Sequence, residues 1–247
     1  MKSCGKIGIK FSIDMSVDEL YSRQMMLPEV GREGQQRLLA ARVLVVGVGG
    51  LGSPVALYLA AAGVGHIGLA DGDVVSLSNL QRQVLYATEE VGKSKVACAR
   101  RRLLQLAPHI AVDTYDCRLD AVNARDLITS YDIVVDGCDN AATRYVIDEE
   151  CARQGKPYVY AAISEYEGQV SVFSMPGAMC YSHLYPDREA AIAEPATPRG
   201  VLGVLPGIVG CVEAAEVVKL ITYCGEPLIN RLFTIDVRTM QSHVFDL

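Results

Sequence analysis

The chain has 247 residues, half of them hydrophobic and 21% charged, with a formal net charge of −6 at pH 7. That length and composition are typical of a soluble globular domain that buries a substantial core. The acidic balance argues against binding to nucleic acid or to an anionic membrane surface.

The start of the chain does not look like a targeting signal. Residues 1–15 lack the continuous apolar core of a secretory peptide. We expect them to form a loosely held extension of a single domain that spans residues 16–247. Eight cysteines are scattered without a C-x-x-C pair, which favours free thiols in a reducing cytoplasm.

Predicted strands and helices alternate along most of the chain. Apolar runs and alternating patterns predict strands over 42–48, 66–71, 110–117, 132–139, 157–163 and 167–175. Helical patterns predict helices over 51–63, 93–107, 140–155 and 205–223. This alternation indicates an α/β fold, Rossmann-like and doubly wound, with a mainly parallel sheet.

The pattern changes towards the C-terminus. Residues 176–199 carry several prolines and little periodicity, so we expect a long crossover loop without regular structure. The apolar stretch 200–221 contains one proline and three charged residues, which favours a buried helix over a membrane span. The last segments, 231–237 and 241–247, suggest antiparallel strands that form a closing hairpin.

A glycine cluster follows the first predicted strand. Gly47, Gly49 and Gly52 fit the spacing G-x-G-x-x-G between a strand and a helix. Such glycines let the backbone approach a phosphate, whose charge the helix N-terminus stabilises. Asp71 ends the second strand 71 − 52 = 19 residues later, where a carboxylate can accept hydrogen bonds from ribose hydroxyls. A tight structural turn, a nicotinamide dehydrogenase and an ATP-dependent enzyme all remain open at this point.

The segment after the turn favours a triphosphate ligand. Asn79, Arg82 and Lys95 follow within a short stretch, and two cations suit a ligand that carries more charge than a pyrophosphate diester. Arg makes bidentate contacts to phosphate oxygens, and Lys acts as a mobile point charge. Asp139 ends the fourth strand at the same carboxyl edge, and a carboxylate beside ATP phosphates is a natural Mg²⁺ ligand. Taken singly, each side chain is also compatible with a solvated surface.

Several motifs resemble one family along nearly the whole chain. They are the stretches GVGGLGSPVALYLAAAGVGHIGLADGDVVSLSNLQRQ, VGKSKV, DGCDNAATR and GVLGVLPGIVG. From about residue 17 to residue 240 they are similar, in the same order, to the MoeB/ThiF/HesA family, the bacterial relatives of ubiquitin-activating enzymes. Members adenylate the C-terminal Gly-Gly carboxylate of a ubiquitin-like sulfur carrier protein of the ThiS or MoaD type and release pyrophosphate. The resemblance implies an ATP-binding adenylation domain over residues 16–247 that serves thiamine or molybdopterin biosynthesis.

The resemblance also implies roles for individual residues. It implies nucleotide contacts for Gly47, Gly49, Gly50, Gly52, Asp71, Asn79, Arg82 and Lys95. It implies Asp139 as the Mg²⁺ ligand, and Arg23 as an arginine that reaches the ATP site of a neighbouring subunit, which requires a homodimer. Arg82, Lys95, Asp139 and Arg23 would form the catalytic set. A carboxylate substrate is already ionised at pH 7, so we expect no catalytic role for any of the four histidines.

Two features depart from the family pattern. Many members bind zinc with two C-x-x-C pairs, whereas here the first reads CYSHLYP, with Cys180 and His183, and the second is missing. Two ligands do not make a closed site, so we do not expect structural zinc. The cysteine that many relatives carry before GVLG is Ala196 here. We therefore expect Cys211 to pack in the core, and the reaction to stop at the acyl-adenylate with sulfur transfer left to a partner.

Other functions are compatible with parts of this pattern. The same fold serves enzymes that adenylate a threonylcarbamoyl carboxylate on tRNA or a peptide C-terminus, although the acidic chain weighs against tRNA. A nicotinamide-dependent dehydrogenase has no need of Asn79, Arg82 and Lys95 clustered at a triphosphate, and a non-catalytic scaffold has no need to retain them. The residues do not indicate which carrier protein is served.

Overall fold

Eight strands form one sheet at the centre of the computed structural model, which describes residues 17–193 and 200–247. The expected extension over 1–15 and Ala196 lie outside the described residues. The strands are β1 (Arg42–Val46), β2 (His66–Ala70), β3 (Ala111–Tyr115), β4 (Ile133–Asp136), β5 (Tyr158–Ser164), β6 (Glu167–Phe173), β7 (Arg231–Asp236) and β8 (Gln241–Asp246). Their order across the sheet is β3-β2-β1-β4-β5-β6-β7-β8.

The sheet changes from parallel to antiparallel at β5. Strands β1 to β5 pair in parallel, with β1 between β2 and β4. Strands β5 to β8 pair antiparallel in chain order. The strand order reverses between β1 and β4, and ligands of open α/β sheets bind at the carboxyl ends of strands at such a reversal. The predicted fold class is confirmed.

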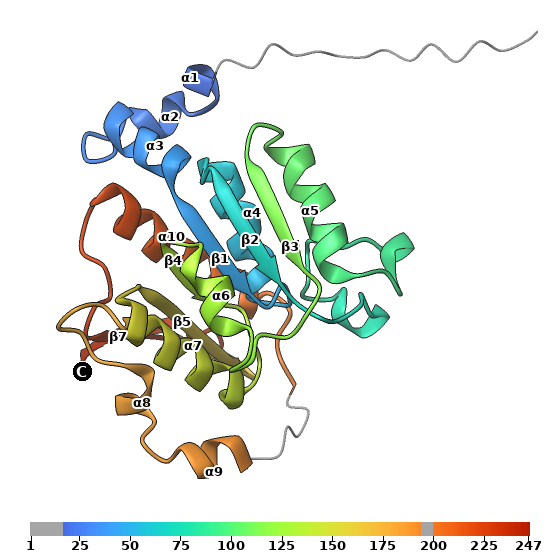
Figure 1. The fold of residues 1–247 in the computed structure, drawn as a ribbon, viewed down its shortest axis with the longest axis vertical. Coiled ribbons are helices and arrows are strands. Elements are labelled where there is room, and N and C mark those ends of the chain that lie inside the picture. Colours follow the sequence, from blue (N-terminus) through green and yellow to red (C-terminus); the bar gives the residue numbers. More distant parts are fainter. Residues whose placement is uncertain (1–16, 194–199) are drawn as a thin grey trace, which may run out of the picture.

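Helices cover both faces of the sheet (Figure 1). One core contains side chains of α4 (Gly52–Ala62), α5 (Lys95–Leu106) and α10 (Leu205–Thr222). The opposite core contains side chains of α6 (Ala124–Thr129) and α7 (Ala141–Gln154). Because β1 and β4 lie between these two layers, nearly all their residues are buried, which explains their unbroken apolar runs.

Apart from two helices in segment 176–199, four α-helices of the described residues lie outside the predicted set. Three precede β1, namely α1 (Val17–Leu20), α2 (Ser22–Met25) and α3 (Gly31–Ala40). Leu38 of α3 joins the core beside α4 and α10. The fourth, α6, has six residues, of which Ala124 and Ile128 are buried. A helix this short repeats too few apolar positions for its period to be recognised.

The prediction that residues 176–199 lack regular structure is wrong for the part that the structure describes. This segment contains α8 (Tyr181–Leu184) and α9 (Arg188–Ala193). The buried Asp148 of α7 accepts hydrogen bonds from the backbone N–H groups of Tyr181 and Ser182, at 2.8 and 3.0 Å. This carboxylate satisfies free N–H groups at the start of α8. It comes from another helix, so local sequence patterns did not reveal it.

The long apolar helix predicted near the C-terminus is α10. It ends at Thr222 because Tyr223 adopts a left-handed backbone with φ of 62°. Two of its glutamates, Glu213 and Glu216, are buried within the protein. No helix in the described ranges combines the length and apolar character needed to cross a membrane.

Candidate functional site

A cavity of about 730 Å³ opens at the carboxyl ends of β1, β2 and β4. The sequence-predicted residues that line it are Gly47, Gly49, Gly50, Asp71, Arg82, Lys95 and Asp139. The structure thus gathers seven predicted side chains or glycines from five separate segments. Gly52, Asn79 and Arg23 are not among the lining residues.

The glycine turn packs tightly against the end of β4. Gly47 has a φ of +85°, and a Cβ atom built on it would lie 2.6 Å from the carbonyl oxygen of Gly137. A Cβ on Gly52 would in turn clash with the carbonyl of Gly47. These two glycines allow close backbone packing, while Gly49 and Gly50 face the cavity. Helix α4 begins here without a side-chain cap. The Ser53 N–H donates to the Gly49 carbonyl at 3.0 Å and Pro54 has no N–H, so the Gly52 N–H is the one at these first three positions that remains available to an anion.

Asp71 and Lys95 belong to a charged cluster at the end of β2. Asp71 accepts hydrogen bonds from the backbone N–H groups of Val48 and Asp73, both at 2.9 Å. The Lys95 ammonium lies 3.1 Å from the Asp73 carboxylate and 3.8 Å from that of Asp71. Burial alone would raise the pKa of Asp73, but hydrogen bonds from Lys95 and Arg118 lower it overall. Asp73 and Arg118, which line the cavity, were not predicted, although the DGD spacing of Asp71 and Asp73 was a signal.

Arg82 is held beside the glycine turn. The backbone N–H of Arg82 donates to the carbonyl of Asn79, and its guanidinium donates to the carbonyl of Ser78 at 3.2 Å. Its aliphatic chain lies next to Gly50. Asn79 ends the short helix η1 (Leu77–Asn79) and contributes to this turn through its backbone. The segment therefore directs the Arg82 side chain to the cavity.

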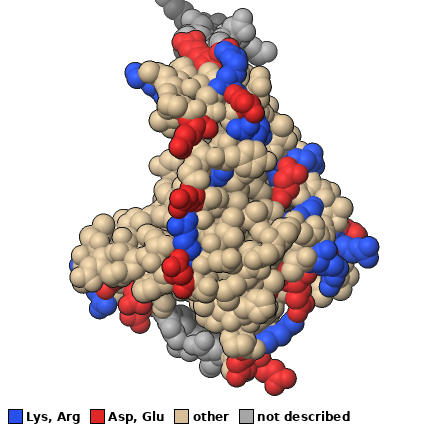
Figure 2. Space-filling model, turned by 90° about the vertical axis from the view of Figure 1, so that its left-hand side faces the viewer, with Lys and Arg blue, Asp and Glu red and all other residues tan. Residues whose placement is uncertain are grey.

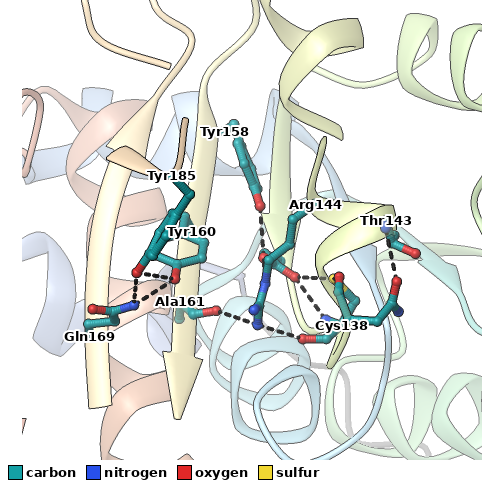
Figure 3. Close-up of polar contacts among 10 residues, drawn as sticks. Cys138, Thr143, Arg144, Tyr158, Tyr160, Ala161, Gln169 and Tyr185 are labelled. Carbon is teal, nitrogen blue, oxygen red and sulfur yellow. Dashed lines mark hydrogen bonds and ion pairs between the residues drawn. The ribbon is translucent and has the colours of Figure 1, made fainter. Parts of the chain in front are cut away.

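Asp139 lines the cavity on a loop that a buried ion pair fixes. Among the described residues, its exposed carboxylate has no hydrogen-bond or ion-pair partner. The loop follows Asp136, which is fully buried and accepts hydrogen bonds from the Cys138 thiol at 2.7 Å and from three further donors (Figure 3). These are the Cys138 backbone N–H at 2.9 Å, the Tyr158 hydroxyl at 2.8 Å and Nε of Arg144 at 3.1 Å.

Arg144 connects this loop to β5. Its Nη2 donates to the carbonyls of Cys138 and Ala161 at 3.1 and 3.3 Å, so the guanidinium joins the end of β4 to β5 (Figure 3). Burial, and next the Asp136 carboxylate, raise the pKa of the Cys138 thiol well above its usual range. Cys138 is therefore a neutral thiol and a poor nucleophile. The Asp136–Arg144 pair was not predicted, because a buried charge pair becomes visible only when β4 and α7 are packed.

Glu213 is a second buried acid near this pair. It is fully buried, and neither carboxylate oxygen has a partner among the described residues. Burial, and next the Asp136 carboxylate, raise its pKa well above the usual range. Below the pKa that Glu213 has in the unfolded chain, the side chain is protonated in both states and does not reduce the stability of the protein. As the pH rises from there towards the raised pKa of the folded state, the unfolded chain ionises first, and the free energy of unfolding falls.

The Glu213→Gln variant is therefore expected to be more stable than the unaltered protein at pH 8, with a difference that shrinks towards pH 4. The gain is about 1.4 kcal/mol for each unit by which folding raises the pKa. Urea denaturation of both proteins at several pH values measures it. The matched control is Glu29→Gln, an exposed site. Parallel stability curves for Glu213→Gln and the unaltered protein would contradict the expectation.

The remaining predicted residues lie elsewhere. Arg23 is exposed on α2, away from the cavity lining. The His183 ring accepts a hydrogen bond from the Cys180 backbone N–H at 3.0 Å. Within the described ranges, no three His, Cys, Asp or Glu side chains gather as metal ligands, and the lack of structural zinc stays a prediction. Cys211 is half-buried, so it lies at the margin of the core rather than within it.

Comparison with known proteins decides the family. The sequence matches the ThiF family over residues 21–247. The chain belongs to the ThiF family. This membership agrees with the predicted resemblance and with the nucleotide-type cavity at the end of the parallel strands.

Several relatives share much of the sequence. A sulfur carrier protein adenylyltransferase of Thermus thermophilus is 47% identical over 87% of this chain and 82% of that protein. The SAMP-activating enzyme E1 of Haloferax volcanii is 43% identical over 93% of this chain and 85% of that protein. The match to a probable adenylyltransferase/sulfurtransferase MoeZ of Mycobacterium tuberculosis, at 46% identity, covers 89% of this chain but only 57% of the longer relative.

Solved structures show the same fold. Escherichia coli MccB in a structure with ATP has a TM-score of 0.78 and 26% identity, over 86% of this chain and 65% of that chain. PaaA has a TM-score of 0.80 and 25% identity, over 97% and 76% of the two chains. The adenylyltransferase relatives and the ATP-bound neighbour place this chain among ATP-dependent nucleotidyltransferases rather than dehydrogenases.

Proposed function

We propose that this ThiF-family protein activates the C-terminal Gly-Gly carboxylate of a ubiquitin-like sulfur carrier protein as an acyl-adenylate, consuming ATP and releasing pyrophosphate. The observation that supports this most strongly is the single cavity that combines an uncapped helix N-terminus, Arg82 and Lys95, and the free carboxylate of Asp139. Two relatives that match over most of their length are named a sulfur carrier protein adenylyltransferase and a SAMP-activating enzyme E1, which is consistent with this reaction.

The cavity residues suit an in-line attack on the α-phosphorus. Asp71 accepts hydrogen bonds from the ribose, while the glycine turn and α4 receive the phosphates. A carrier carboxylate oxygen forms the new bond to the α-phosphorus, and the bond to the bridging oxygen breaks as pyrophosphate leaves with its electron pair. Both reactants are anionic, so Arg82 and Lys95 lower their repulsion and stabilise the charge that develops.

Asp139 is suited to the proposed role of Mg²⁺ ligand. Its carboxylate lies at the cavity without a partner among the described residues, and hard divalent cations prefer such oxygen ligands. When bound beside the phosphates, the cation would neutralise part of the charge on the departing pyrophosphate. The protein contributes the fixed position of the loop, which Asp136 and Arg144 hold.

A second cavity offers a route for the carrier tail. It has a volume of about 490 Å³ and is lined by residues of β5, β6, β7 and β8. Ile163 and Ser164 line both cavities, so the two adjoin at the end of β5. An extended tail lying over the antiparallel strands would bring its last carboxylate to the nucleotide.

We further propose a homodimer in which Arg23 enters the partner's nucleotide cavity. Arg23 is exposed on α2 and does not line its own cavity. The face in Figure 2 has a broad central area with few charged side chains, and depletion of charge is typical of surfaces that pack against another protein. Seven described cysteines are free thiols, which supports a cytoplasmic location.

Exchange of labelled pyrophosphate into ATP tests the proposed reaction. Exchange is expected with a ThiS-type or a MoaD-type carrier that ends in Gly-Gly, because formation of the acyl-adenylate is reversible. The matched control is the same carrier without its last two residues, which should support none. Exchange with threonylcarbamoyl-tRNA or a free peptide, but with neither carrier, would favour those alternative substrates and overturn the proposal.

A further inference from the structure

The nucleotide cavity and the second cavity are joined by three side chains, Arg144, Tyr160 and Gln169. Arg144 lines the nucleotide cavity, and Gln169 lines the second cavity. Tyr160 lies between them on β5 and is 1% exposed. The two cavities are therefore connected through the protein interior, as well as along the lining that they share at the end of β5.

The nucleotide end of this link is the contact between Arg144 and Tyr160. The guanidinium carbon lies 5.4 Å from the centre of the Tyr160 ring, within the range of a cation–π contact. The same guanidinium donates hydrogen bonds to the carbonyls of Cys138 and Ala161, and Cys138 directly precedes Asp139. A shift of the Tyr160 ring would therefore alter the support of the loop that carries Asp139.

The other end of the link is a hydrogen-bonded group of two hydroxyls and one amide (Figure 3). Nε2 of Gln169 donates to the Tyr160 hydroxyl at 2.7 Å and to the Tyr185 hydroxyl at 2.5 Å. The Tyr160 hydroxyl donates to that of Tyr185 at 3.3 Å. Both N–H groups of the amide are thus used, while Oε1 accepts no hydrogen bond within the described part of the chain. Because Gln169 lines the second cavity, a peptide N–H that enters there can supply the missing partner.

The hydroxyl of Tyr160 stands in otherwise aromatic surroundings. The Tyr160 ring lies 5.5 Å from the ring of Phe173 and 5.2 Å from that of Tyr181, between centroids. Apolar side chains of the same shape could replace both partners of a buried hydrogen bond at almost no cost in stability. Packing alone therefore does not account for this polar contact, whereas a contact that extends to the wall of the second cavity responds to a ligand there.

We propose that Tyr160 and Gln169 are positioning residues that couple the two cavities, so that a carrier tail in the second cavity strengthens the binding of ATP. This inference deepens the proposed function and rests on its assignment of the two cavities. A tail N–H bonded to Oε1 restricts the Gln169 amide, and the amide restricts the Tyr160 ring. The ring in turn holds Arg144, which supports the loop of Asp139. A first ligand that orders such groups lowers the ordering cost of the second, and ATP strengthens binding of the tail by the same factor.

The test removes the hydroxyl but keeps the ring, in Tyr160→Phe. The ligand is α,β-methylene ATP with Mg²⁺, in which a CH2 group replaces the oxygen that would leave, so no reaction occurs. Its Kd is measured by calorimetry without carrier and with a saturating ThiS-type or MoaD-type carrier. In the unaltered protein the carrier is expected to lower this Kd by about fivefold or more, as is typical of coupled sites. In Tyr160→Phe the Kd without carrier should stay within about twofold of the unaltered value, and the carrier should lower it by less than about twofold.

Tyr145→Phe is the matched control. It also removes one hydroxyl from this aromatic cluster, but that hydroxyl donates to the backbone carbonyl of Tyr185 at 2.6 Å and not to Gln169. The variant should keep the full effect of the carrier. Gln169→Met should lose it, and adding Tyr160→Phe should cause no further loss, because both substitutions break one link.

An undiminished carrier effect in Tyr160→Phe would overturn the proposal, as would an unaltered protein whose Kd does not respond to the carrier. Equal loss of the effect in Tyr160→Phe and Tyr145→Phe would assign both hydroxyls a structural role and overturn it as well. Pyrophosphate exchange by the unaltered protein is followed in parallel. Exchange without a carrier effect on the Kd refutes the coupling alone, whereas neither exchange nor carrier binding refutes the proposed function and the coupling together.

Discussion

Exchange of pyrophosphate into ATP is expected to fall by about 10³–10⁵-fold in the Arg82→Ala variant, the magnitude known for arginines that stabilise phosphoryl transfer. Arg82 lies against Gly50, and among the described residues its guanidinium makes one hydrogen bond, to the carbonyl of Ser78. Its other N–H groups therefore remain available to phosphate, whereas Lys95 already contacts Asp73. Exchange rates at saturating ATP and carrier measure the effect.

A matched control separates this effect from a general loss of positive charge. Arg102 is exposed on α5, and Arg102→Ala should leave exchange within about twofold, because surface charges on a helix contribute little. Loss of less than tenfold in Arg82→Ala would contradict the assignment of Arg82 to the reacting phosphates.

Mixing the two arginine variants tests the proposed dimer in the same assay. If Arg23 completes the partner's site, Arg23→Ala should be inactive alone. A heterodimer with Arg82→Ala would then contain one site with both substitutions and one site with neither. Random mixing should restore activity at about a quarter of all sites in a symmetric dimer. No recovery after dissociation and remixing would exclude this arrangement.

The Asp136→Ala variant is expected to lose about 3–5 kcal/mol of unfolding free energy, as when one partner of a buried ion pair is removed. Asp136 accepts hydrogen bonds from Cys138, Tyr158 and Arg144 (Figure 3). Its removal leaves the guanidinium of Arg144 buried without a counter-charge. Urea denaturation at pH 7 measures the loss.

Two further variants define the cause of that loss. Asp126 is exposed on α6, and Asp126→Ala should change stability by less than about 0.5 kcal/mol. Adding Arg144→Met to Asp136→Ala should recover part of the stability, because the uncompensated charge is then removed. A loss below about 1 kcal/mol for Asp136→Ala would show that the pair does not hold the loop of Asp139.

The central strands could be predicted because their environment is uniform. Strands β1 and β4 are buried on both faces, so Val43–Val46 and Ile133–Val135 form uninterrupted apolar runs. Helix α8 could not be predicted, since the carboxylate that satisfies its first N–H groups belongs to Asp148 of α7. A pairing between segments that are distant in the sequence leaves no trace in local periodicity.

The residues of the candidate site also divide into those that local sequence could predict and those that only packing reveals. Arg82, Lys95 and Asp139 were predicted because chemistry at strand ends favours such residues, and all three line the cavity. Asp136 and Arg144 were not predicted, because the sequence shows two ordinary charged residues and only packing shows that they neutralise each other in the interior. Gln83, which also lines the cavity, was not predicted, because nothing in the sequence reveals that it is buried there.

The position of β5 between two kinds of pairing has a consequence for how substrate preference can change. On one side β5 pairs in parallel with β4, next to the nucleotide cavity, and on the other it pairs antiparallel with β6. Substitutions in β6, β7 or β8 would reshape the second cavity without altering Gly47, Arg82 or Asp139. If the carrier tail lies in the second cavity as proposed, the parallel half of the sheet would hold ATP and the antiparallel half would select the acid, so that each could diversify independently.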